Sequence, residues 1–146
     1  MSADLLTGTG LVVGVLEQGS DLSVGEVQLR PVGAQHAFNH QWVPTVSNVG
    51  VHLWAPGELS LFHPGDAYDA EPGEVDVLAV PINAPWCAVR DSIDFVRRIA
   101  PLALVPIHDG LLAAPGRSLY LTHIATNGGD GLTLHDLAGR GAVSIP

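Results

Sequence analysis

Three side chains in this sequence have the types and positions of metal ligands: His36, Asp66 and His108. Each comes just after an apolar run of the kind that forms a strand, and Asp66 ends the turn His63-Pro64-Gly65-Asp66. Strand ends at one edge of an α/β sheet are where such folds assemble their sites. Two imidazoles and a carboxylate suit Zn²⁺, Mn²⁺ or iron, and an aspartate can bridge two ions. On residue types alone, a loop histidine, a turn-capping aspartate and a strand-end histidine without a shared role is the commoner arrangement.

The strands that would position these ligands are indicated by short apolar segments between turn residues. Val27 and Leu29 alternate with Gln28 and Arg30, which is typical of a half-buried strand. A long loop without a clear period follows, and loops of this length are usually functional. We predict strands at residues 25–32, 49–54, 59–63, 75–82 and 102–107, a strand or short buried segment at 11–16, and a last strand at 142–145.

A helix is predicted over residues 88–100. Its apolar residues Val89, Ile93, Val96 and Ala100 fall on one face, and Pro101 ends it. The economical reading of residues 75–107 is therefore a strand, a helix and a strand joined by a parallel crossover. A second helix could occupy residues 118–125.

The bulk composition fits one α/β domain over residues 1–146. Hydrophobic residues make up 47% of the chain and charged residues only 14%, which suggests that part of the apolar surface meets another chain. The net charge of −9 would repel nucleic acid. The N-terminal stretch lacks a basic region and no apolar run is long enough for a membrane span, so we expect a cytoplasmic protein with no membrane partner.

Four motifs occur in an order that resembles the C-terminal half of a metallo-β-lactamase-fold hydrolase, in the branch related to sugar-acid lactonases. They are Ala34-Gln35-His36, His63-Pro64-Gly65-Asp66, residues 76–82 (DVLAVPI) and Val105-Pro106-Ile107-His108. The likeness covers roughly residues 10–115. It implies half of an αββα sandwich with a mixed sheet and flanking helices, with His36, Asp66 and His108 as ligands of divalent zinc or manganese. It also implies a catalytic role for Asp66 in the hydrolysis of a lactone, ester, amide or phosphodiester.

One motif of that family is missing here. No His-x-His-x-Asp-His string occurs, and the nearest pattern, His36-x-x-x-His40, would align two imidazoles only in a helix, against which Asn39 and Pro44 argue. The metal centre is therefore expected to be incomplete or empty within one chain. The alternative function is a non-catalytic module that kept the fold and acts by binding or assembly, so the sequence leaves enzymatic activity open.

Five further residues are expected around the three candidate ligands, in supporting or pocket-lining positions. His63 could orient Asp66, Asp69 could hydrogen-bond the same turn, and Asp109 could support His108 or cap a helix. Asn83 and Trp86 follow the 75–82 strand at the edge where a pocket would lie.

Half a sandwich leaves one face of its sheet without a cover. Each Val, Leu or Ile buried there would contribute roughly 1.5–3 kcal/mol. We therefore expect a homodimer, or a partner chain that completes the sandwich, and a small-molecule substrate if the protein is active. If the chain were instead a monomer, residues 111–146 would have to fold over the open face.

Overall fold

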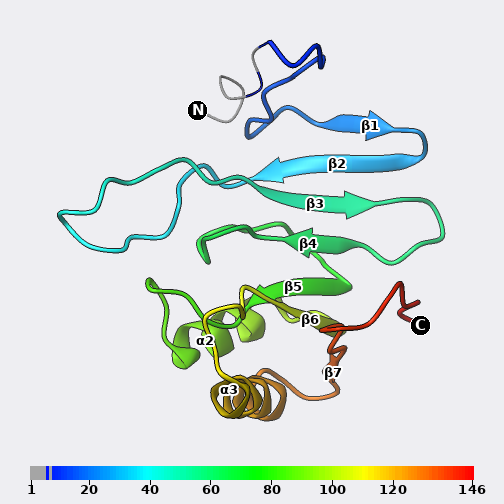
Figure 1. Cartoon of the computed structure of the whole chain (residues 1–146). Helices are drawn as coiled ribbons and strands as arrows, with labels where there is room; N and C mark the ends of the chain where they lie inside the picture. The colour runs from blue at the N-terminus through cyan, green and yellow to red at the C-terminus, as the bar shows by residue number, and fades with distance from the viewer. Residues whose placement is uncertain (1–5, 7) are drawn as a thin grey trace.

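In the computed structural model, which describes residue 6 and residues 8–146, the chain forms a single mixed sheet with two helices (Figure 1). This confirms the predicted α/β class. The elements in chain order are β1 (Leu22–Val24), β2 (Val27–Val32), β3 (Gly50–Trp54), β4 (Leu61–His63), β5 (Val77–Pro81), α2 (Val89–Ile99), β6 (Ala103–Ile107), α3 (Ala114–Asn127) and β7 (Thr133–Leu134).

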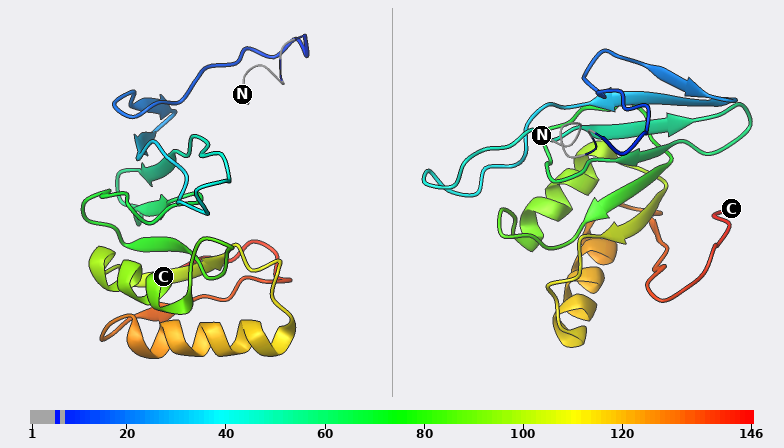
Figure 2. Two further views of the ribbon diagram at one scale, coloured as in Figure 1. Left: turned by 90° about the vertical axis from the view of Figure 1, so that its left-hand side faces the viewer. Right: turned by 45° about the horizontal axis from the view of Figure 1, so that its top comes forward.

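The strands lie in the sheet in the same order as in the sequence. β1 to β4 pair antiparallel as successive hairpins, whereas β4 to β7 pair parallel. The predicted crossover from β5 through α2 to a parallel β6 is confirmed. Both helices lie at the β5–β6 end of the sheet, and β1 to β3 extend beyond them (Figures 1 and 2).

Local signals fix the ends of α2. The Asp91 carboxylate accepts a hydrogen bond of 2.6 Å from the Ala88 amide, so it satisfies one of the free donors at the helix start. At the other end Ala100 takes a left-handed conformation (φ 51°), and Pro101 cannot continue the helix. The buried residues Phe95, Val96 and Ile99 then join the core.

The two faces of the sheet differ in what covers them. Phe62, Leu78 and Leu104 are register partners across β4, β5 and β6, and all three are fully buried in the core that α2 closes. The opposite face is also apolar, but on β1 and β2 it is open, with Leu22, Val24 and Val27 at 49%, 68% and 40% exposed. Half-buried side chains continue this open face across the sheet: Leu29, Val51, Leu53 and Leu61.

Two of the predicted strands were wrong, and two short strands, β1 and β7, were missed. Residues 11–16 are extended but unpaired and mostly exposed, because β1 takes the edge beside β2. Residues 142–145 form no strand either. The position beside β6 is taken by β7, held by hydrogen bonds from Thr133 N to Leu102 O (3.1 Å) and from His135 N to Leu104 O (2.8 Å). Apolar composition alone does not decide which segment reaches a free sheet edge.

The second helix is longer than predicted. α3 starts at Ala114, with Pro115 in its first turn where proline is tolerated, and ends at Asn127. Its Ile124 packs into the core next to Val96 of α2. Among the described residues, no helix is both long and apolar enough to cross a membrane.

His52 is a buried histidine without hydrogen-bond partners. It lies on β3, on the same face as Phe62, with 8% of its surface exposed, and neither ring nitrogen is hydrogen-bonded. Its ring instead packs on Trp54 and Phe62, with centroids 5.2 Å and 6.5 Å away. Burial, and then the charge of Arg30, lower the pKa of His52 below its ordinary 6.5, while Pro72 and Asp76 oppose the shift. The folded chain therefore holds this imidazole neutral.

We expect His52 to make the fold sensitive to acid. Because its pKa is lowered in the folded state, the unfolded chain binds the extra proton, and stability falls as the pH drops below about 6.5. His52→Phe removes both unpaired nitrogens and this proton. As the pH is lowered from 7.5 to 5.0, the unfolding free energy of the variant minus that of the parent should increase, as measured by urea unfolding. A constant difference at the two pH values would contradict this account.

Candidate metal site

The site begins with a contact between Asp66 and His108. The Asp66 Oδ1 and His108 Nε2 atoms lie 2.9 Å apart, with the side chains 40% and 35% exposed, respectively. Asp66 follows β4 and His108 follows β6, so the contact spans the end of β5. Two of the three predicted ligands are therefore brought together at one edge of the sheet.

The orientation of His108 is set by the backbone. Its Nδ1 lies 2.6 Å from the Asn83 carbonyl oxygen, so Nδ1 carries a proton and the Nε2 atom is turned toward Asp66. His108 also takes a left-handed conformation (φ 60°), which a residue other than glycine adopts only at a cost. Asn83 was expected at the edge where a pocket would lie, and its backbone carbonyl faces His108 there.

The turn that carries Asp66 is held by Asn48, a residue that the sequence patterns did not single out. Asn48 Oδ1 accepts from the Asp66 amide at 2.9 Å, and Asn48 Nδ2 donates to the Pro64 carbonyl at 2.9 Å. His63, expected to orient Asp66, instead accepts from the Gly65 amide through Nδ1 at 3.1 Å. His63 therefore supports the turn and not the Asp66 carboxylate itself.

His36 lies nearby but does not join the pair directly. Its Nδ1 is 2.7 Å from the Ala37 carbonyl oxygen, and the Ala37 amide donates to the Asp66 carbonyl at 2.8 Å. The Trp86 ring lies between the two histidines in an edge-on arrangement, with centroids 6.2 Å from His36 and 6.3 Å from His108. Within the described part of the chain, no three His, Cys, Asp or Glu side chains are close enough to hold one ion.

The remaining candidates have other surroundings. Asp109 pairs with Arg117 at 2.5 Å, and Arg117 also holds Asp136 at 2.7 Å, so these charges tie the segment after His108 to the chain after β7. His40 is exposed and packs on Trp42. Burial raises the pKa of the Cys87 thiol, which fits a small apolar side chain and not a nucleophile.

A cavity of about 320 Å³ opens beside His36. Phe38 and Thr45 of the loop line one wall, and Tyr68 and the exposed Asp69 line another. Tyr68 is fixed there because its ring packs on Trp86 and Phe95 and its hydroxyl bonds Ser92 at 2.8 Å. The predicted residue Asp69 thus borders a space in which part of a substrate could lie.

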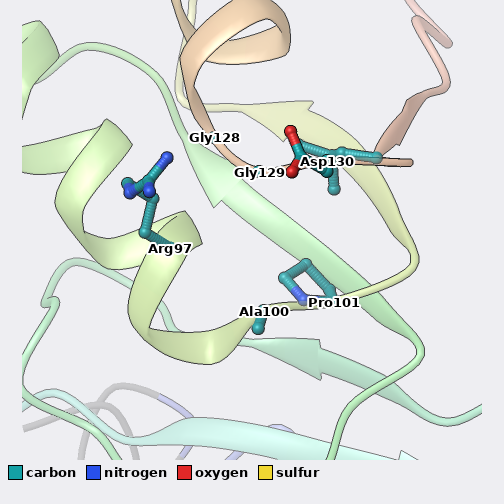
Figure 3. Close-up of a pocket in the computed structure, with 7 residues that line it drawn as sticks. Arg97, Ala100, Pro101, Gly128, Gly129 and Asp130 are labelled. Carbon is teal, nitrogen blue, oxygen red and sulfur yellow. The ribbon is translucent and has the colours of Figure 1, made fainter.

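A second hollow lies far from these residues. It has a volume of about 190 Å³ between the C-terminal ends of α2 and α3, where Arg97 and Asp130 flank Ala100, Pro101 and the Gly128-Gly129 turn (Figure 3). Arg97 uses its guanidinium to bond the Asn127 carbonyl at 2.9 Å, which caps the end of α3. We interpret this hollow as a packing crevice.

The carboxylate of Asp66 and the imidazole of His108 are groups that can bind a divalent cation. A neutral His108 that donates through Nδ1 presents a lone pair on Nε2, and this lone pair faces a carboxylate oxygen 2.9 Å away. Two acceptors at that distance need a positive charge between or beside them, either a proton or a metal ion. Histidine ligands of metals are commonly anchored in this way through the other ring nitrogen.

Comparison with known proteins identifies the family. A family described as "Beta-lactamase superfamily domain" matches residues 4–108, more than half of the chain. The chain belongs to this superfamily. It is 36% identical over 112 residues to Protein Rv0786c of Mycobacterium tuberculosis, which covers 74% of this chain but 53% of the relative. The chain therefore spans about half the length of this curated relative.

Solved structures show the same fold. A protein from Parabacteroides distasonis, proposed to be a metal-dependent hydrolase, aligns with a TM-score of 0.64 and 20% identity, over 84% of this chain and 56% of that one. Igni18, a metallo hydrolase from Ignicoccus hospitalis, aligns with a TM-score of 0.63 and 16% identity, over 92% and 61%. The predicted metallo-β-lactamase fold is confirmed, and these relatives are metal-dependent hydrolases by description.

We expect Arg117→Met to loosen both segments that this side chain joins. Loss of charged hydrogen bonds to Asp109 and Asp136 should cost roughly 1–3 kcal/mol of unfolding free energy. Arg117 holds the pKa of Asp136 at about 2, so the parent should lose this stabilisation as the pH falls below about 3.8, and the variant should not. Arg90→Met, which removes an exposed arginine on α2, is the control.

Proposed function

We propose that this chain supplies part of the metal centre of a metal-dependent hydrolase. The observation that carries the proposal is the Asp66–His108 contact, in which the Oδ1 and Nε2 atoms lie 2.9 Å apart while the Asn83 carbonyl orients the imidazole. His36 is the third ligand in this proposal, which requires its side chain or the loop around it to move toward the pair. Superfamily membership supports a divalent metal, zinc or manganese, at this edge.

The roles of the residues follow from their surroundings. A divalent ion at this edge would polarise a substrate carbonyl or phosphoryl group and lower the pKa of water. Asp66 would hold the ion and could accept a hydrogen bond from the attacking water, because its side chain is 40% exposed. Trp86 and Tyr68 exclude solvent on the inner side, and the cavity beside His36 receives the rest of the substrate.

The charges around this edge favour a neutral substrate. A metal ion would offset the charge of Asp66, but the exposed Asp69 borders the cavity, and Arg117 is already occupied by Asp109 and Asp136 and so is not free to bind a phosphate. An anionic phosphodiester would be repelled by this surface. We therefore favour a lactone, an ester or an amide.

The open sheet face supports a second proposal, that two copies of the chain complete the sandwich. Leu22, Val24 and Val27 leave branched apolar side chains in water, and the half-buried row from Leu29 to Leu61 continues them. A second sheet packed on this face would bury them. The relative of about twice the length offers the other solution, in which one chain provides both halves.

Metal binding tests the first proposal. The purified chain should bind Zn²⁺ or Mn²⁺ in isothermal titration calorimetry, and Asp66→Ala and His108→Ala should each weaken binding at least about tenfold, because each removes a direct ligand. Asp94→Ala, an exposed carboxylate on α2, should leave binding unchanged. If the folded parent takes up neither metal, the non-catalytic module becomes the better account.

Two substitutions separate function from folding. Asp66→Ala should abolish hydrolysis of a lactone and ester panel yet keep the circular dichroism spectrum of the parent, because Asp66 lies in a turn outside the core. Val80→Asp should unfold the chain by burying an unpaired charge, since Val80 is fully buried on β5. Equal hydrolysis by the parent and by Asp66→Ala would remove Asp66 from the mechanism.

Sedimentation tests the dimer. At micromolar concentration the chain should sediment as a dimer, with an interface on the order of 2,000 Å² or more as in obligate dimers. Val27→Asp on the open face should give monomers, whereas Leu119→Asp, an exposed leucine on α3, should remain dimeric. A monomeric parent would rule out assembly through this face.

A further inference from the structure

The most tightly specified part of the candidate site is a side chain that is not itself a ligand. Asn48 lies at the end of the loop between β2 and β3, and its amide group makes two hydrogen bonds to the turn after β4. Its Oδ1 accepts from the Asp66 amide at 2.9 Å, and its Nδ2 donates to the Pro64 carbonyl at 2.9 Å. One side chain therefore satisfies backbone groups on both sides of Gly65.

The same residue also anchors the loop that carries His36. The backbone N–H of Asn48 donates to the Ala34 carbonyl at 3.2 Å. The backbone N–H of His36 donates to the Val46 carbonyl at 3.0 Å, and these two bonds close the base of the loop. The Ala37 amide then donates to the Asp66 carbonyl at 2.8 Å. The backbone that bears His36 and the backbone that bears Asp66 are thus joined through Asn48 at one end and Ala37 at the other.

Gly65 fits this arrangement. Its φ of +69° disfavours any side chain, and a Cβ at this position would collide with Asn48 Oδ1. The close approach of the turn to Asn48 therefore depends on glycine. The Asn48 side chain and Gly65 together fix the turn and so the direction of the Asp66 carboxylate.

We propose that Asn48 is a positioning residue that joins the His36 loop and the Asp66 turn into one rigid unit, which sets the ligand geometry at the sheet edge. This inference rests on the proposed metal centre for its consequence, but the coupling itself exists without metal. A side-chain amide is needed at position 48 because the turn presents one donor, the Asp66 N–H, and one acceptor, the Pro64 carbonyl. An aspartate can accept from Asp66 N but cannot donate to Pro64 O.

Amide hydrogen exchange of the metal-free chain tests the coupling. In Asn48→Ala the Asp66 amide should exchange at least about tenfold faster, and the Ala37 amide should follow, while amides of β5 keep their parent rates. Asn39→Ala, an exposed asparagine of the same loop, is the control and should change neither. Asn48→Asp keeps the acceptor for the Asp66 amide but loses the donor to Pro64, and it carries the test if Asn48→Ala unfolds: the Asp66 amide should stay near its parent rate while the Ala37 amide exchanges faster than in the parent. Parent-like exchange at both Asp66 and Ala37 in Asn48→Ala would overturn the proposal.

Metal titration tests the consequence. Asn48→Ala should weaken Zn²⁺ binding about 10- to 100-fold at a temperature where the variant keeps the circular dichroism spectrum of the parent, because a supporting partner of the ligands is lost. Parent affinity in Asn48→Ala would refute a positioning role even if the metal centre is real. If the parent itself binds no metal, the proposed function fails, and the exchange measurement still decides whether Asn48 couples the two segments.

A double-mutant cycle adds a second independent measurement. Gly65→Ala strains the backbone in any background, but its collision with Oδ1 exists only when Asn48 is present. Gly65→Ala should therefore lower the folding equilibrium constant less in the Asn48→Ala background than in the parent, by at least about threefold. Additive effects would mean that the two residues are not coupled.

Discussion

The contact between Asp66 and His108 must cross β5, which lies between the two strands that lead to these residues. Neighbouring strands lie roughly 4.8 Å apart, so the ends of β4 and β6 are separated by about 10 Å and the side chains must reach over the end of β5. The turn after β4 and the left-handed residue His108 after β6 both redirect the chain toward this point. The crossover through α2 fixes β6 in its parallel position, so the core that buries Phe95 and Val96 also determines the spacing of the site.

The residues that sequence patterns could find are those with a side-chain signal. The three candidate ligands follow apolar runs: His36, Asp66 and His108. Composition and the spacing of apolar residues predict β5, α2 and β6. The orientation of the histidines could not be found in this way, because the Asn83 and Ala37 carbonyls that face their Nδ1 atoms are backbone groups. Any residue at those positions would supply the same oxygen, so no residue type marks them. Asn48 does act through its side chain, yet nothing in its loop distinguishes it from Asn39 until the fold brings it to Pro64 and Asp66.

The errors at the two ends of the chain have a common physical cause. Residues 11–16 and 142–145 are apolar enough for strands, but a strand forms only where a neighbour offers unpaired backbone groups. The two edges of this sheet are taken by β1 and β7, which have exposed or short sequences of no special pattern. Edge positions depend on chain geometry more than on composition, so they were the least predictable part of the fold.

The proposed dimer would account for both the open face and the small number of ligands. The face bears Leu22, Val24 and Val27, and the predicted ligands are too few for a closed metal centre within the described residues. In a two-layer sandwich the second sheet lies against that face, and the edges of both sheets meet at the same end. A second half packed on β1 to β4 would therefore bury the apolar side chains and bring its own loops close to Asp66 and His108. Burial of apolar surface and completion of the ligand set would then be two results of one docking event, so in this proposal metal binding depends on assembly.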